Sequence, residues 1–497
     1  MKAFVAAAML AAVSATALQA QEPPADPTAD WSPQQWSAAA RTDVLESYRQ
    51  FIENHPGVYD LDNPGFLEQL GDAREAGLAA ADEASDRLGY DMALARFSSV
   101  LADGHARAYT PGSASNQDTP RYWPGFVALW RGDRLLVRTK DETSSLHGAS
   151  ITACEGQPIA DFLSERLVVS GFRPKELGQW WVRPSQLFYS IGEVAPHQPR
   201  SCTFAFSDGH SETVALEWQN PTTEQRDFYG ASVYPAAEPL GLSEPREGIF
   251  VIGLGDFQPD EAGRAKYEAL YETVAARREE LLAADAVVID MRGNDGGSSM
   301  WSLNLARLLW GEEAVATRRP EIIGIDWRAS RETIAYVKEM RAMFAERNEA
   351  EMVEWLDNTI GQMEVALEAG QPLWRDAGSS DEEKNERPAP APTDFKTPVY
   401  VINWGLCASA CLDANDYFKL FDNTRLIGAP TSADSTYMEI RGVKLPAGPG
   451  WLTIPNKTWV GRQRGWGEIY EPDIVMDQLD WSTEAFLDRI EADLAAG

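Results

Sequence analysis

The stretch TPVYVINWGLCASACLDANDYFKLF, residues 397–421, contains a strand signal, a turn of small residues and an amphipathic helix signal in immediate succession. The β-branched and aromatic run before Gly405 is typical of a buried strand, and the apolar residues after Ser409 recur at helical spacing. A strand-to-helix turn exposes a side chain at the strand end while backbone N–H groups converge there. Ser409 therefore predicts either a nucleophile or a helix N-cap, a position that serine commonly occupies.

The same order of elements occurs earlier, from residue 246 onward. GIFVIGLGDF predicts a strand, AGRAKYEALYETVAARREELL a helix with one apolar stripe, DAVVIDMR a second strand, and SSMWSLNLARLLWG a helix after a Gly-rich turn. Strands that alternate with helices predict an α/β domain with largely parallel strands, here residues 246–497. We expect an insertion at 317–395, a charged helical stretch followed by a Pro-rich linker, which acts as a lid or a mobile loop.

Two further domains are expected before the α/β domain. Residues 37–115 show helical periodicity and end in LADGHARAY, which carries His105. Residues 116–245 contain short alternating runs separated by Gly, Asp and Ser, which predict a β-rich module. Residues 21–36 are rich in Pro and Asp and predict a flexible lead-in.

The first twenty residues, MKAFVAAAMLAAVSATALQA, place one Lys before an apolar run that ends in small residues. This pattern predicts a secretory signal peptide at residues 1–20, and hence an exported protein that is periplasmic if the cell is Gram-negative. No later stretch reaches the roughly 18 apolar residues of a membrane span, so no stable membrane insertion is expected. The formal charge of −32 repels phosphate backbones, which excludes nucleic acid as a partner. The oligomeric state does not follow from the sequence.

Four cysteines in an oxidising compartment allow three pairings. Cys154 and Cys202 flank a β-rich stretch and could staple it. Cys407 and Cys411 lie one helical turn apart beside Ser409, where a disulfide or inert packing is favoured over a thiol nucleophile. No second Cys/His pair at zinc-site spacing accompanies them, so we expect no metal and no cofactor.

His105 is the best candidate for a general base among the five histidines. The contexts of the other four indicate turns or the surface: ENHPG, SLHGA, APHQP and DGHSE. The segment VVIDMRGNDGGSS suits backbone donors aimed at an oxyanion, although it also reads as a simple tight turn. Arg292 and Asn294 are expected to pin this turn by hydrogen bonds. A metal site at Asp290 and Asp295 is disfavoured, since no His or carboxylate cluster accompanies them.

Together these features resemble the tricorn and C-terminal-processing (tail-specific) serine protease family. The resemblance covers most of the expected mature chain and rests on FIENHPGVY, LADGHARAY, GASITACEGQPIADFL, VVIDMRGNDGG, CASACLDANDYF and GEIYEPDIVM. It implies a multidomain α/β protein, in which a crotonase/Clp-protease-type α/β catalytic domain follows a helical N-terminal domain and a PDZ-like β-rich module.

The resemblance also implies a mechanism. Ser409 would attack a peptide carbonyl and form an acyl-enzyme. The oxyanion hole would consist of the backbone N–H of Ala410 together with that of Gly296 or Gly297.

Two ways of activating the serine occur in this family. In the processing proteases a Lys stands where this chain has Asp434, so the Ser-Lys dyad is absent. In the tricorn-like branch the base is a His, which His105 matches, and Glu468 is the expected orienting acid, with Glu471 as the alternative. Gly104 stands where tricorn has a Ser before its His.

The sequence thus predicts an exported serine peptidase that acts on peptides or proteins. Two alternatives stay open. One is a catalytically inactive relative that binds peptides or small apolar ligands. The other is a hydrolase that uses the same site on an ester.

Overall fold

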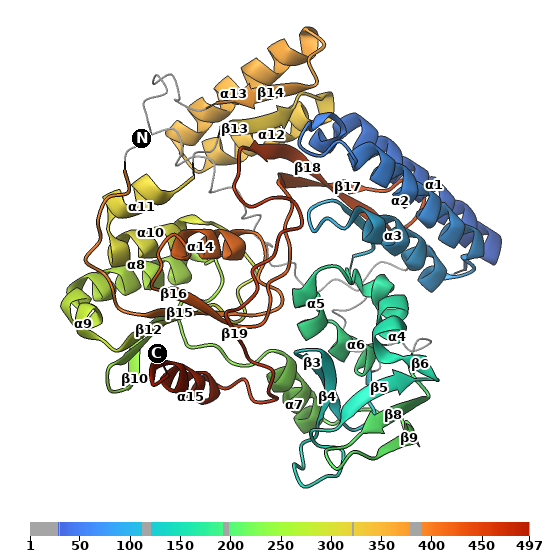
Figure 1. The fold of residues 1–497 in the computed structure, drawn as a ribbon. Helices are drawn as coiled ribbons and strands as arrows, with labels where there is room; N and C mark the ends of the chain where they lie inside the picture. Colours follow the sequence, from blue (N-terminus) through green and yellow to red (C-terminus); the bar gives the residue numbers. More distant parts are fainter. Residues whose placement is uncertain are drawn as a thin grey trace.

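The computed structural model describes residues 28, 30–111, 121–191, 198–320, 323–377 and 389–496. The expected signal peptide lies outside the described residues, as does most of the Pro-rich linker expected within the insertion. The described part is a mixed α/β protein of several regions, arranged in Figure 1 with the helical region in blue and the α/β region in yellow-green to red. Nowhere in these ranges is a helix both long and apolar enough to span a bilayer.

The first region is helical. Helix α1 begins at Pro33, inside the lead-in that was expected to extend to residue 36. A capping box explains this start, because the Ser32 hydroxyl accepts from the Gln35 N–H while the Gln35 side chain accepts from the Ser32 N–H. The helices are α1 (Pro33–Asn54), the 3-10 helix η2 (Pro56–Tyr59), α2 (Phe66–Glu83) and α3 (Arg87–Leu101).

The second region is built on an antiparallel sheet. Its strands are β3 (Val127–Arg131), β4 (Arg134–Arg138), β5 (Ser150–Cys154), β6 (Gln157–Pro158), β8 (Ser201–Ala205) and β9 (Ser211–Ala215), while β2 (Arg121–Tyr122) pairs with β7 (Ser190–Ile191). Its helices are α4 (Ile159–Arg166), η3 (Leu167–Ser170), α5 (Leu177–Val182), α6 (Pro184–Leu187) and α7 (Thr223–Val233). A disulfide joins Cys154 of β5 to Cys202 directly opposite on β8. Its PDZ-like character stays a prediction.

The third region is the α/β region. Its sheet has the order β10 (Gly241–Arg246), β11 (Ile249–Gly253), β12 (Ala286–Asp290), β15 (Val399–Asn403), β16 (Thr424–Gly428) and β19 (Ile474–Val475). The pairs from β11 to β19 are parallel and only β10 is antiparallel, which confirms the prediction of largely parallel strands. Its helices are α8 (Glu261–Ala276), α9 (Arg278–Ala283), α10 (Met300–Trp310), α11 (Glu312–Arg318), α14 (Ala410–Phe418) and α15 (Thr483–Leu494).

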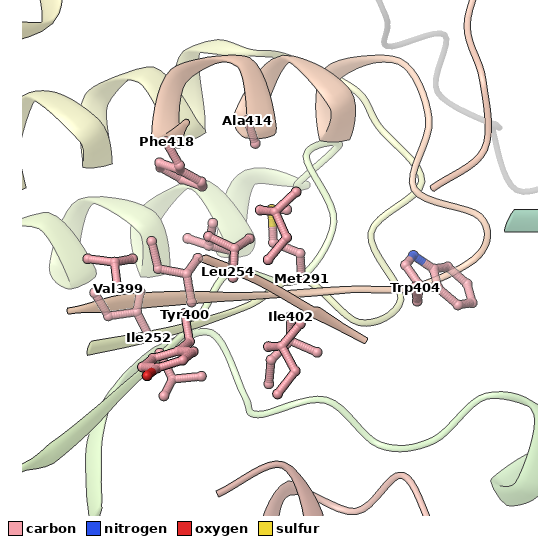
Figure 2. Close-up of a cluster of buried hydrophobic side chains, with 14 of the residues drawn as sticks. Ile252, Leu254, Met291, Val399, Tyr400, Ile402, Trp404, Ala414 and Phe418 are labelled. Atoms are coloured by element: carbon pink, nitrogen blue, oxygen red, sulfur yellow. The ribbon is translucent and has the colours of Figure 1, made fainter. Parts of the chain in front are cut away.

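Strand β15 lies in the centre of this sheet and is covered on both faces. Figure 2 shows Ala414 and Phe418 of α14 directed at one face, while Tyr400 points to the other. The Tyr400 hydroxyl donates to Asp493 of α15 at 2.7 Å, so α15 covers the second face. All five residues of β15 are buried, which explains why its sequence is apolar without alternation.

The expected insertion contributes strands as well as helices. It consists of β13 (Gly324–Arg328), α12 (Arg331–Glu346), α13 (Ala350–Glu368) and β14 (Leu373–Asp376). These strands complete a second sheet with β1 (Arg107–Tyr109), β17 (Tyr437–Lys444) and β18 (Trp451–Val460), in the order β1-β18-β13-β14 with β17 also paired to β18. The insertion is therefore part of a sheet, in addition to the helices that its charged sequence predicted.

This second sheet joins the helical region to the α/β region. Strand β1 follows α3 and lies antiparallel to β18. Asp43 of α1 accepts from the N–H groups of Ala447 and Gly448, at 2.9 and 2.8 Å, in the loop between β17 and β18. Because His105 stands just before β1, this docking places it beside the start of β17.

Candidate active site

Ser409 occupies the turn between β15 and α14 in a rare backbone conformation. Its φ is 53° and its ψ is −126°, and its side chain makes no capping hydrogen bond. A non-glycine residue in such a region costs about 1–3 kcal/mol and persists only where its surroundings fix it. The helix N-cap role, which would explain this serine without catalysis, is therefore not what its hydroxyl does.

Several contacts fix the turn. A disulfide joins Cys407 to Cys411, one on each side of Ser409. The Trp404 indole donates to the Asn294 carbonyl at 2.7 Å, and the Ser432 hydroxyl donates to the Gly405 carbonyl at 2.9 Å. The turn is thus tied to the Gly-rich loop on one side and to the segment after β16 on the other.

The Gly-rich loop after β12 lies directly against Ser409. A Cβ on Gly296 would stand 2.8 Å from the Ser409 Cβ, so only glycine permits this approach. The Gly296 N–H donates to the Asn294 side-chain oxygen at 3.0 Å, which confirms that Asn294 pins the turn. Among the described residues, no hydrogen bond is made by the N–H of Gly297 or of Ala410. Of the three N–H groups expected as oxyanion donors, those of Gly297 and Ala410 are therefore free to bind an oxyanion.

Arg292 fixes the end of β12, where the Gly-rich loop begins. Its guanidinium donates to the Asp290 carboxylate at 2.6 Å and to the Trp481 carbonyl at 2.6 Å, and both charged side chains are buried. Arg292 thus holds the strand end, while Asn294 holds the glycines.

His105 lies after α3, which ends with Ala102 in the left-handed region at φ 51°. Its Nδ1 is 2.9 Å from the Tyr437 carbonyl oxygen. A carbonyl can only accept, so Nδ1 carries the hydrogen and Nε2 is left as the acceptor of the neutral ring. The backbone N–H of His105 donates to the Asp103 carboxylate at 2.8 Å. Burial raises the pKa of Asp103, and the charge of His105 partly offsets this.

A carboxylate absent from the expected triad lies beside the His105 ring. Oδ1 of Asp434 is 3.3 Å from Nδ1 of His105, and the Asp434 side chain is only 5% exposed. The same Oδ1 accepts from the Ser435 N–H at 2.8 Å. In the sequence, Asp434 was identified only as the residue that stands in place of a lysine. A carboxylate at that position also indicates a partner for a histidine.

For the two glutamates expected as orienting acids, no contact with His105 is found within the described ranges. Glu468 is exposed, and its carboxylate accepts from the Gly465 N–H at 2.8 Å. Glu471 is also exposed. The loop that carries Glu468 is linked to the surroundings of His105 through the backbone of Asp434. The N–H of the neighbouring Gly467 donates to the Asp434 carbonyl at 3.0 Å.

A buried charge cluster lies between α14 and Asp434. The Arg464 guanidinium donates to Asp413 at 2.8 Å and to Asp416 at 3.2 Å, and its Nη1 is 3.9 Å from Oδ2 of Asp434. Burial would lower the pKa of Arg464, but the carboxylates of Asp416, Asp413 and Asp434 outweigh it and raise that pKa. Burial would likewise raise the pKa of Asp413, but Arg462 and Arg464 hold it below its usual range.

His55 lies at the turn between α1 and η2, as its context indicated, but not on the surface. It is fully buried, its Nδ1 accepts from the Gly57 N–H at 3.0 Å, and its ring stacks on Phe66. Burial lowers the pKa of His55 to about 3, so it stays neutral and structural.

The structure places the residues of the candidate site in two groups. Ser409 and Ala410 form one with Gly296, which precedes Gly297, and His105 forms the other with Asp434, which was not among the expected residues. The segment from Ser432 to Asp434 connects them, because Ser432 bonds the Ser409 turn and Asp434 contacts His105. In the described ranges, no hydrogen bond joins Ser409 Oγ to Nε2 of His105, and no group of three or more His, Cys, Asp or Glu side chains is arranged to hold a metal ion.

Solved structures share this arrangement of elements. Mature CPAF matches with a TM-score of 0.59 at 14% identity, over 92% of this chain and 98% of CPAF. The chain has the fold of CPAF. Mature CPAF complexed with lactacystin gives a TM-score of 0.57 at 13% identity, with the same coverage of 92% and 98%.

The photosystem II D1 C-terminal processing protease matches at a TM-score of 0.35 and 13% identity, over 89% of this chain and 95% of its own. At that score the superposition carries no argument by itself. Neither a family model nor a curated protein sequence matches the chain. What these comparisons support is the likeness of the chain to CPAF at the level of the fold.

Proposed function

We propose that the protein is a serine peptidase in which Ser409 is the nucleophile and His105 the general base. The observation that carries the proposal is the conformation of Ser409, which combines a strained backbone with a hydroxyl that no capping bond uses. Such strain is typical of functional turns. A serine with a purely structural role at a helix start would adopt ordinary dihedral angles and cap the helix.

The proton path follows from the tautomer of His105. Since Nδ1–H is held by the Tyr437 carbonyl, Nε2 accepts the Ser409 proton as Oγ attacks the carbonyl carbon. Nε2 then gives this proton to the leaving amine, and water later releases the acyl group from Ser409.

The oxyanion would be received by the N–H groups of Gly297 and Ala410. Both are unused in the structure, and Ala410 starts α14, whose N-terminus favours negative charge. The Gly296 N–H is excluded as a donor while it bonds Asn294. Loss of one such donor costs about 10²–10³ in kcat.

We further propose that the protein is exported, because its first twenty residues have the pattern of a signal peptide. Peptides or proteins outside the cytoplasm would then be its substrates. Fractionation of the native host with an antibody tests this, and a chain that keeps residue 1 and stays in the cytoplasm would contradict it.

Turnover of a mixed peptide library tests the peptidase proposal. The protein without residues 1–20 is compared with Ser409→Ala and His105→Ala, with circular dichroism as the control for folding. We expect cleavage that falls by about 10³ or more in each variant. A parent protein that retains peptides without cleaving them would favour the inactive binding protein, and one that cleaves only esters would favour the esterase.

A further inference from the structure

We propose that Asp434 is the positioning carboxylate of His105, in place of Glu468. This inference rests on the proposed function and names a further residue of the same site. Asp434 stabilises the positive imidazolium that forms when Nε2 takes the proton of Ser409. The proton moves only from Oγ to Nε2 and then to the leaving amine.

The geometry favours Asp434 over the two glutamates. Its Oδ1 stands 3.3 Å from Nδ1 of His105, in a side chain that is 5% exposed. Charges that are screened little by water interact more strongly than exposed charges. Glu468 instead bonds the Gly465 N–H from an exposed position, and Glu471 is exposed as well.

The roles of the two acceptors on Nδ1 differ. The Tyr437 carbonyl, at 2.9 Å, takes the hydrogen and fixes the tautomer, but it supplies no net charge. The Asp434 carboxylate, slightly farther away, supplies the charge that the imidazolium needs. The backbone therefore orients the ring, and the carboxylate stabilises its protonated form.

Arg464 lies near the Asp434 carboxylate without neutralising its charge. Its closest partners are Asp413 and Asp416, whose two negative charges balance the two positive charges of Arg464 and the neighbouring Arg462. Asp434 lies beyond them, 3.9 Å from Arg464, so its charge is left for His105. Asp413 lies in the first turn of α14, the helix that follows Ser409. One cluster thus anchors both the helix of the nucleophile and the carboxylate of the base.

The test compares kcat and KM of the protein with those of Asp434→Asn and Glu468→Gln on one peptide substrate. We expect Asp434→Asn to lower kcat by about 10²–10⁴ with little change in KM, and Glu468→Gln to lower it less. Asp60→Asn is the matched control. Asp60 bonds the hydroxyl of Tyr437 at 2.8 Å but does not touch His105 in the described structure, so kcat should change little.

A second variant separates the role of the charge from a role in folding. Asp434→Ala removes the carboxylate, and added formate is expected to restore part of kcat, whereas a structural defect would not respond to formate. A larger loss in Glu468→Gln than in Asp434→Asn would overturn the proposal, and so would Asp434→Ala without formate rescue. If Asp434 variants do not fold, a loss of about 10² or more in Glu468→Gln overturns it, and a smaller loss supports it.

Failure of the proposed function has a different signature. In that case the unmodified protein itself cleaves no peptide, and the role of Asp434 fails with it. Failure of the Asp434 proposal alone leaves the unmodified protein active.

Discussion

At the scale of single residues, the site depends on backbone positions that few side chains tolerate. Ser409 adopts φ 53° without being glycine, while Gly296 and Gly297 adopt φ 122° and 130° beside it. The close approach of Gly296 to Ser409 leaves no room for a Cβ. The proposed chemistry of the turn therefore depends on backbone geometry as much as on the serine hydroxyl.

Gly297→Ala tests the oxyanion donor. Its Cβ would stand 2.2 Å from the Phe257 carbonyl oxygen, so the loop must shift and its N–H must move. We expect kcat to fall by about 10² or more while the protein stays folded. Gly293→Ala is the matched control, because its φ of 81° is also positive but nothing lies within 4 Å of the new Cβ. Equal losses in the two variants would show that the donor of Gly297 is not used.

Asp103→Asn tests how burial beside His105 affects stability. The pKa of Asp103 is raised above 3.8 in the folded state, so the folded protein holds this proton to a higher pH than the unfolded chain. The resulting stability is complete below the unfolded pKa and is lost as the pH rises through the folded pKa. We expect Asp103→Asn to gain relative to the parent protein as the pH rises above 3.8, the pKa from which burial raises Asp103, measured by urea unfolding. A difference that is constant with pH would contradict this.

At the scale of elements, Ser409 is held by the unit that consists of β15, the turn after it and α14. Figure 2 shows α14 packed on the sheet through Ala414 and Phe418. This packing holds the helix in place and with it the N-terminal end, where Ser409 lies. The two disulfides serve different elements. One closes a separation of 48 residues across a sheet, and the other closes a separation of 4 residues around Ser409.

The disulfides should therefore separate stability from activity. In the chain-entropy account, the loss of Cys154–Cys202 costs about 4 kcal/mol of unfolding free energy and the loss of Cys407–Cys411 about 2 kcal/mol. We expect the Cys407→Ser/Cys411→Ser variant to lose more kcat, about tenfold or more, because the strained Ser409 can relax. Denaturant unfolding and steady-state kinetics measure both effects. Unchanged kcat in this variant would show that the disulfide does not hold the turn.

At the scale of the whole molecule, the proposed site requires that two regions dock. His105 belongs to the helical region and Ser409 to the α/β region, and the sheet of β1, β17 and β18 joins them. Tyr90 and Asp43 support this joint, since the Tyr90 hydroxyl donates to Asp43 at 2.6 Å and accepts from the Gly450 N–H at 3.0 Å. A substitution that weakens this joint should therefore lower activity, although it lies away from Ser409 and His105.

Asp43→Ala tests this dependence. It leaves the Tyr90 hydroxyl and the N–H groups of Ala447 and Gly448 without their acceptor, which costs about 2–4 kcal/mol of unfolding free energy. We expect kcat to fall as His105 loses its fixed place. Asp82 forms an ion pair with Arg41 on the same region, and its side chain is 58% exposed. Asp82→Ala should therefore cost less than about 1 kcal/mol and leave kcat intact. The measurements are thermal unfolding and peptide turnover. An unchanged kcat in Asp43→Ala would contradict the dependence.

Local patterns predicted much of this molecule, and long-range pairing accounts for what they missed. The parallel sheet and the turn at Ser409 follow from strand and helix signals that are adjacent in the chain. The neighbourhood of His105 does not, because its contact with Tyr437 spans 332 residues and arises from the ladder of β1, β18 and β17. Strands β13 and β14 were missed because they are short and flank long charged helices.

The central claim is that Ser409 is an activated nucleophile. Incubation with a fluorophosphonate, followed by intact-mass measurement and peptide mapping, tests it without assuming a substrate. We predict a single adduct on Ser409 that is absent from Ser409→Ala and forms much more slowly in His105→Ala. No adduct, or an adduct that persists in Ser409→Ala, would contradict the account.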